Sequence, residues 1–118
     1  MANKYKYFIA NWKMFGDFSS LKIINSVNNY ISKIKSKKNK VIFCVPSTLI
    51  SHFSNRLKKS NISIGAQNCH YLDEYGPYTG SINSKMIKEI GTEMIPNFLI
   101  INKNEIKAIK DDTNWENA

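Results

Sequence analysis

Short apolar runs alternate with segments of helical periodicity over residues 5–90. The apolar runs have the length of buried strands. In the segments between them, apolar residues recur every three or four positions, which indicates helices with one buried face. Strands that alternate with helices pair in parallel, so the sequence predicts an α/β fold. The predicted strands span 5–10, 41–45 and 62–66, and the predicted helices reach from about 20 to 34, 47 to 59 and 84 to 90.

Polar residues precede each predicted helix and are candidate caps. The segment 17–20 offers several of them, Ser47 follows Pro46, and Ser84 opens the third helix, which Gly91 would end. Residues 67–83 are polar and aromatic and contain a Gly-Pro turn signal, so they are expected to form a long loop.

Asn11 and Lys13 stand where the first predicted strand meets a loop. On an extended backbone, residues two apart point the same way, so both would face one site while Trp12 turns into the packing. An amide beside a cation suits a phosphate or a developing enolate. Ligands of parallel α/β folds bind at the carboxyl ends of strands. The alternative reading, a lysine that is merely solvated after a strand, stays open.

The net charge of +8 raises the question of a nucleic-acid partner. Arg56 is the only arginine, and the densest basic run, over 35–40, falls in a predicted link between a helix and a strand. Such runs are usually solvated, so no nucleic-acid partner is expected. The sequence also shows no membrane-spanning segment or secretory signal. Cys44 and Cys69 are expected to be buried reduced thiols without a metal, in a cytoplasmic protein.

Several motifs resemble those of triosephosphate isomerase. Their order and spacing over residues 5–91 make the resemblance specific. The resemblance implies the first three to four β/α units of a (β/α)8 barrel, a fold of about 250 residues. The motifs are Ala10-Asn11-Trp12-Lys13-Met14, Gly65-Ala66-Gln67-Asn68-Cys69, Gly76-Pro77-Tyr78-Thr79-Gly80, Ile82, Met86-Ile87-Lys88 and Ile90-Gly91.

The resemblance also implies a function and its residues. The family interconverts dihydroxyacetone phosphate and glyceraldehyde 3-phosphate without a cofactor or a metal. By resemblance, Lys13 would bind substrate and stabilise the enediolate charge, and Asn11 would hydrogen-bond the substrate. Loop 67–83, with Thr79 near its tip, would lie in a homodimer interface, with Gly76, Tyr78 and Thr79 as interface residues. A mobile surface loop is the alternative, and whether a chain of this length dimerises is left open.

The resemblance stops after Gly91. The family's fourth strand ends in Gly-His-Ser-Glu, but residues 92–118 contain no histidine, and His52 and His70 lie in other segments. The family's catalytic glutamate has no counterpart either. We interpret 1–91 as the amino-terminal part of the barrel and 92–118 as a divergent tail, from a frameshift, a premature stop or a sequence error.

The missing catalytic residues predict that the chain alone is inactive. The apolar segment 98–101 predicts an edge that favours self-association. The alternative function is a non-catalytic binding or assembly module that docks through loop 67–83 and an open sheet edge.

Overall fold

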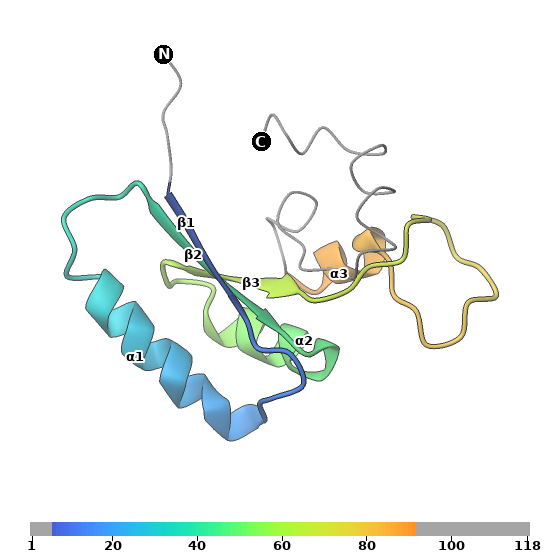
Figure 1. The fold of residues 1–118 in the computed structure, drawn as a ribbon, viewed down its shortest axis with the longest axis horizontal. Coiled ribbons are helices and arrows are strands. Elements are labelled where there is room, and N and C mark those ends of the chain that lie inside the picture. Colours follow the sequence, from blue (N-terminus) through green and yellow to red (C-terminus); the bar gives the residue numbers. More distant parts are fainter. Residues whose placement is uncertain (1–5, 92–118) are drawn as a thin grey trace, which may run out of the picture.

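The computed structural model describes residues 6–91, which form a three-stranded sheet with helices packed on it (Figure 1). A long loop over 67–83 projects from the sheet on the side away from the first helix (Figure 1). The strands are β1 (Lys6–Asn11), β2 (Asn39–Val45) and β3 (Ile62–Ala66), and the helices are α1 (Leu21–Ile31), α2 (Ser47–Arg56) and α3 (Ser84–Glu89), with a 3-10 turn η1 (Phe18–Ser20) before α1.

The three strands are parallel and lie in the order in which they occur in the chain, β1-β2-β3. Asn11 is paired with Cys44, and Cys44 with Gly65. The carboxyl ends of all three strands therefore meet at one edge of the sheet. The predicted alternation of strands and helices and the parallel pairing are both confirmed.

One face of the sheet carries the hydrophobic core. Phe43 and Val45 point toward the helices, whereas Ile42 and Cys44 alternate to the opposite face and are also buried. All three α-helices contribute to the same cluster, so they cover the same face. The cluster consists of Ile24, Phe43, Val45, Leu49, Ile50, Phe53, Leu57, Ile62, Ile64, Ala66, Cys69 and Ile87.

Two of the predicted helix caps are wrong by one residue. The cap of α3 is Asn83, whose Oδ1 accepts a hydrogen bond from the backbone N–H of Met86 at 3.0 Å, and Ser84 is the first helical residue. The cap of α2 is Pro46, with extended ψ, and Ser47 lies inside the helix. In contrast, the predicted capping segment 17–20 does open a helix: the Asp17 carboxylate accepts hydrogen bonds from the hydroxyls of Ser19 and Ser20.

The first two helices end three residues earlier than predicted. α1 ends at Ile31, and the Ser32 hydroxyl turns back to donate to the Asn29 carbonyl at 2.9 Å. α2 ends at Arg56, where Leu57 leaves helical geometry with ψ near 11°. At the end of α2, Arg56 and Lys59 would lie one turn apart on a continued helix, and like charges at this spacing disfavour the continuation. The apolar spacing alone overestimated both lengths.

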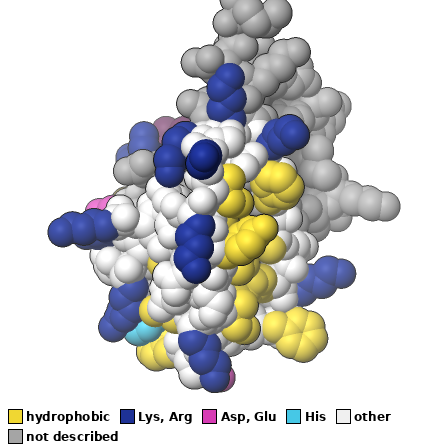
Figure 2. Space-filling model, turned by 90° about the vertical axis from the view of Figure 1, so that its left-hand side faces the viewer, with side chains coloured by type: hydrophobic (Ala, Val, Ile, Leu, Met, Phe, Trp, Pro, Cys, Tyr) yellow, Lys and Arg dark blue, Asp and Glu magenta, His cyan; other side chains and the backbone are white. Residues whose placement is uncertain are grey.

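A hydrophobic groove of about 480 Å³ lies between β1 and α1. Within residues 6–91, β1 pairs only with β2, so its other edge is open. Phe8 is 55% exposed and Tyr30 is 70% exposed. Figure 2 shows a stripe of hydrophobic side chains on this side of the molecule with basic side chains around it. The groove is lined by Phe8, Ile9, Ala10, Val27, Tyr30, Ile31, Ile34, Asn39, Val41 and Phe43.

Gly16 allows the loop after β1 to fold under Trp12. Its φ is +115°, and an added Cβ would lie 2.8 Å from the Trp12 ring. We expect Gly16→Ala to lower the free energy of unfolding by about 1–3 kcal/mol, measured by urea denaturation. Gly80→Ala is the control, because Gly80 also has positive φ (+82°) but its Cβ would meet no atom within 4 Å. Equal losses in both variants would show that the contact with Trp12 is unimportant.

Candidate functional site

Asn11 and Lys13 lie together at the carboxyl end of β1. Asn11 is the last residue of the strand, and its Oδ1 accepts a hydrogen bond from the backbone N–H of Lys13 at 2.9 Å. Lys13 has φ of +56°, the left-handed region, which costs a residue with a side chain on the order of 1 kcal/mol. The alternation of side chains that an extended backbone would give therefore ends before Lys13. Asn11 and Lys13 are connected instead by the hydrogen bond from the Lys13 N–H to the Asn11 side chain.

Gln67 connects this loop to the other two strands. Its Nε2 donates to the carbonyl of Lys13 at 2.8 Å and to the carbonyl of Cys44 at 2.9 Å. The Cys44 carbonyl also accepts from the backbone N–H of Trp12 at 3.0 Å. Because Gln67 directly follows β3, one amide holds the ends of all three strands in register. In the sequence, Gln67 stands only within the Gly65–Cys69 motif, and no local signal indicates this role.

Trp12 anchors the same loop on the helical face. Its ring packs edge-on against Phe43 of β2 and Phe53 of α2, each at a centroid distance of 5.9 Å. This confirms the prediction that Trp12, which stands between Asn11 and Lys13 in the chain, turns into the hydrophobic packing. The loop is thus fixed by packing on one face and by the Gln67 amide at the sheet end.

The side chain of Lys13 is exposed at this edge, beside the exposed Asn11 amide. Asn11 Oδ1 already accepts a hydrogen bond from the backbone N–H of Lys13. The Nδ2 group of Asn11 is therefore the part of the amide that could donate a hydrogen bond to a ligand. An ammonium and an N–H donor on a fixed backbone can stabilise an anion, or negative charge that develops during a reaction. The chemistry expected from the sequence is therefore compatible with the geometry.

Loop 67–83 is closed at its base and carries exposed aromatic residues. The His70 ring stacks between Tyr71 and Tyr78, at 4.8 and 4.4 Å between ring centroids. The backbone N–H of His70 donates to the Ile82 carbonyl at 2.7 Å, and a Cβ at Gly76 would overlap the Tyr78 ring. The segment therefore has a defined conformation.

The three predicted interface residues, Gly76, Tyr78 and Thr79, are all exposed on loop 67–83. Their exposure leaves them accessible to a partner, and their role in an interface stays a prediction.

His52 packs in α2, away from the hydrogen bonds around Lys13. Its ring stacks on Phe18 at 3.9 Å and its Nδ1 lies 3.0 Å from Arg56 Nη1. Desolvation, and then the charge of Arg56, lower the pKa of the His52 imidazole below its usual value of 6.5. The neutral imidazole can accept a hydrogen bond from Arg56, whereas the protonated one would repel it.

This lowered pKa predicts a loss of stability in weak acid. The unfolded chain takes up the proton first, so the contribution is complete above pH 6.5 and is lost as pH falls through the folded-state pKa. We expect the urea midpoint to fall between about pH 7.5 and pH 5.5, with a smaller fall in His52→Gln and an intermediate one in Arg56→Gln. If the urea midpoint of His52→Gln falls with pH as steeply as that of the unchanged protein, the pH dependence does not come from His52.

A parallel sheet with helices on one face and candidate site residues at the carboxyl ends of its strands fits the architecture of β/α-barrel enzymes. The chain matches the family model of triosephosphate isomerase over residues 6–116. It therefore belongs to the triosephosphate isomerase family, and its described residues form the first three β/α units of the barrel. No helix within residues 6–91 is long and apolar enough to cross a membrane.

Relatives and solved structures agree with this family. The chain is 41% identical over 96 residues to the triosephosphate isomerase of Bartonella henselae, covering 80% of this chain and 37% of the relative. It is 44% identical over 87 residues to that of the Wolbachia of Brugia malayi, covering 70% and 34%. The crystal structure of the Bartonella henselae enzyme superposes with a TM-score of 0.67 at 39% identity, covering 76% of this chain and 36% of that one.

The chain thus spans little more than a third of the length of these relatives. The predicted fourth unit, the boundary at residue 91, the divergent tail over 92–118 and the apolar edge at 98–101 fall outside the described residues. These stay predictions, as do the catalytic and binding roles of Asn11 and Lys13.

Proposed function

We propose that this chain supplies the substrate-binding cation of a triosephosphate isomerase. The proposed reaction interconverts dihydroxyacetone phosphate and glyceraldehyde 3-phosphate. Lys13 neutralises the negative charge of the phosphate and the enediolate, and Asn11 donates a hydrogen bond to the substrate. The observation that carries the proposal is the position of Lys13, which Gln67 holds against the ends of β2 and β3.

The chain by itself has only part of the chemistry. A general base contributes about 10² to 10⁴ in rate, and a well-placed donor to the developing charge about 10² to 10³. In the family, a glutamate and a histidine fill these roles, and neither matches a residue of this chain. We therefore expect the 118-residue chain alone to turn over triose phosphate near the background rate.

A complementation assay tests this proposal. The chain is mixed with a second polypeptide, the part of the Bartonella henselae enzyme beyond the region aligned with this chain, and turnover is followed with a coupled dehydrogenase. Turnover that requires both polypeptides supports the proposal. Efficient turnover by the 118-residue chain alone would contradict it. So would a mixture that co-purifies as a folded complex without turnover, because Lys13 would then not complete an active site.

We further propose a cytoplasmic location and a homodimer contact through loop 67–83. The exposed Tyr75 and the stacked Tyr78 on this loop support an interface, since aromatic residues are enriched at interfaces. Analytical ultracentrifugation of the complemented enzyme measures this contact. Thr79→Arg places a charged side chain in the proposed contact. It should therefore shift the complemented enzyme from a dimer toward a complex that holds one copy of each polypeptide. Dimers that persist unchanged with this substitution would place the interface elsewhere.

The second candidate function is a non-catalytic assembly module, and the open edge of β1 favours it. The groove beside this edge is hydrophobic, and within residues 6–91 β1 pairs with β2 alone, so another chain could add a strand along its other side. In this case a partner binds along β1 and no isomerase activity appears. Co-purification without turnover in the complementation assay is the result that would favour the module over the enzyme.

A further inference from the structure

A polar cavity lies at the end of the sheet opposite to Lys13. Its volume is about 320 Å³, and it lies where β2 and β3 begin, since it includes Asn39 and Asn61. The seven residues of β2 span roughly 20 Å at about 3.3 Å per residue, so this cavity is remote from the proposed active site. It is lined by Ile31, Ser36, Lys37, Asn39, Lys40, Ser60, Asn61 and Ser63.

The charged side chains that line this cavity have one sign. Every charged side chain between residues 18 and 72 is a lysine or an arginine. Lys37 and Lys40 line the cavity, and Lys35 and Lys38 flank them in the chain. Basic side chains gather at the upper end of the surface in Figure 2. An anion in the cavity would meet a positive potential with no carboxylate from this segment to oppose it.

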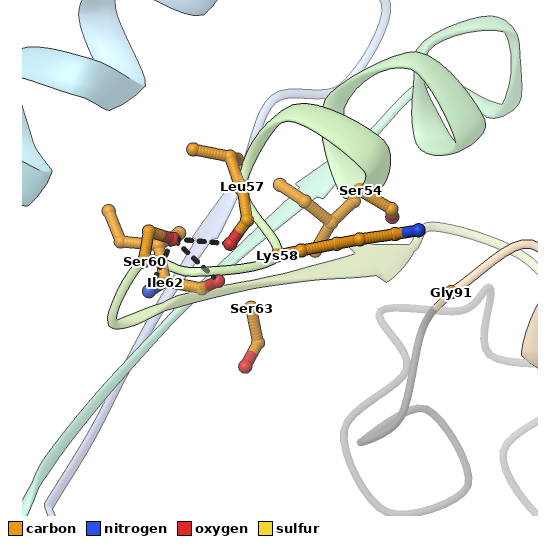
Figure 3. A pocket seen from close by; sticks show the side chains of 8 residues that line it. Ser54, Leu57, Lys58, Ser60, Ile62, Ser63 and Gly91 are labelled. Atoms are coloured by element: carbon orange, nitrogen blue, oxygen red, sulfur yellow. Dashed lines mark hydrogen bonds between the residues drawn. The ribbon is translucent and has the colours of Figure 1, made fainter.

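The polar wall of the cavity is fixed by hydrogen bonds. Ser60 Oγ donates a hydrogen bond to the Leu57 carbonyl at 2.8 Å and accepts one from the backbone N–H of Ile62 at 3.1 Å. Figure 3 shows this serine and these two partners in the view of a neighbouring pocket that they line. The backbone N–H of Asn61 donates to Asn28 Oδ1 of α1 at 3.2 Å. These contacts hold the turn before β3 against α1. One wall of the cavity is therefore fixed, and hydroxyl and amide groups line the cavity beside two lysines.

We propose that this cavity binds a small molecule that carries several phosphate groups. Lysine is a compact, flexible point charge that binds phosphate oxygens, and several lysines suit a ligand with several negative charges. The cavity has the size of a small-molecule site. A nucleic-acid polymer is disfavoured, because no aromatic side chain lines the cavity and both of its cations are lysines. This inference does not depend on the proposed isomerase activity.

The test uses inorganic tripolyphosphate as the probe and isothermal titration of the full 118-residue chain. Lys37→Gln/Lys40→Gln should weaken binding about tenfold or more. Lys22→Gln/Lys85→Gln removes the same charge from exposed positions outside the cavity and should leave affinity within about twofold. Since Lys40 lies in β2, Lys37→Gln alone, in the exposed turn, provides a second variant that keeps the strand intact.

Several results would overturn the proposal. An absence of saturable binding would do so. Equal weakening of binding by both double variants would also do so, because it would indicate a general charge effect. An RNA oligonucleotide that binds more tightly than tripolyphosphate, with the same sensitivity to Lys37→Gln, would indicate an extended nucleic-acid surface instead. In the supporting case, nuclear magnetic resonance shifts on addition of tripolyphosphate concentrate at residues 36–40 and 60–63 and spare residues 11–13.

Discussion

Replacing Lys13 by methionine is expected to lower kcat/KM of the complemented isomerase about 10²- to 10³-fold. Methionine keeps the Cβ and an unbranched side chain as far as Cε, so the left-handed backbone at φ +56° is strained in both proteins and the ammonium group is what is lost. The coupled assay measures the effect. The loss should appear in both KM and kcat, because in the proposed mechanism the ammonium binds the substrate phosphate and stabilises the developing enediolate.

Lys22→Met is the matched control for this substitution. Lys22 is an exposed lysine of α1 and has no part in the hydrogen bonds at the carboxyl end of the sheet. Its substitution removes one positive charge from the same protein, so it reports the general effect of net charge on an anionic substrate. Equal losses in the two variants would remove Lys13 from the proposed mechanism.

Phe53→Ala is expected to lower the free energy of unfolding by about 3–5 kcal/mol. Phe53 is fully buried at 0% exposure, contacts the edge of Trp12, and belongs to the cluster that joins the helices to the sheet. Small domains have about 5–15 kcal/mol of stability in total, so this single change removes a large share of it. Urea denaturation followed by circular dichroism measures the loss, with Trp12 fluorescence in a Trp115→Phe background as a local probe.

Phe15→Ala is the control for the core substitution, because Phe15 is 76% exposed. The same atoms are removed from a surface position, and the loss should stay below about 0.5 kcal/mol. A comparable loss in both variants would mean that the cluster around Phe53 is not the cooperative core. The fluorescence of Trp12 should change only in Phe53→Ala.

The sequence predicted the elements of this fold well because its apolar spacing is a local signal. The strand over 62–66 has the predicted bounds, and the other two strands differ by one or two residues where the structure describes them. The errors lie at helix ends. There, the outcome depends on Ser32 turning back to Asn29 and on Asn83 acting as the cap in place of Ser84. Such choices depend on competing hydrogen bonds that periodicity does not record.

The candidate site was predictable only in part. Asn11 and Lys13 could be found because both stand at the end of an apolar run, where an α/β fold places its ligands. The role of Gln67 could not be found, because its two carbonyl partners come from residues 54 and 23 positions away in the chain. Likewise, the stack of His52 on Phe18 depends on how η1 meets α2. Contacts between distant segments need the tertiary structure.

The neighbour order of the strands has a consequence for biosynthesis. Each strand pairs with the one made immediately before it, so a nascent chain can add one β/α unit at a time as it leaves the ribosome. Loop closure between such neighbours costs little entropy, whereas joining the first and last strands of a ring spans the whole polypeptide. In a relative that closes the complete barrel, the open side of β1 would therefore be the last strand edge to be paired during translation.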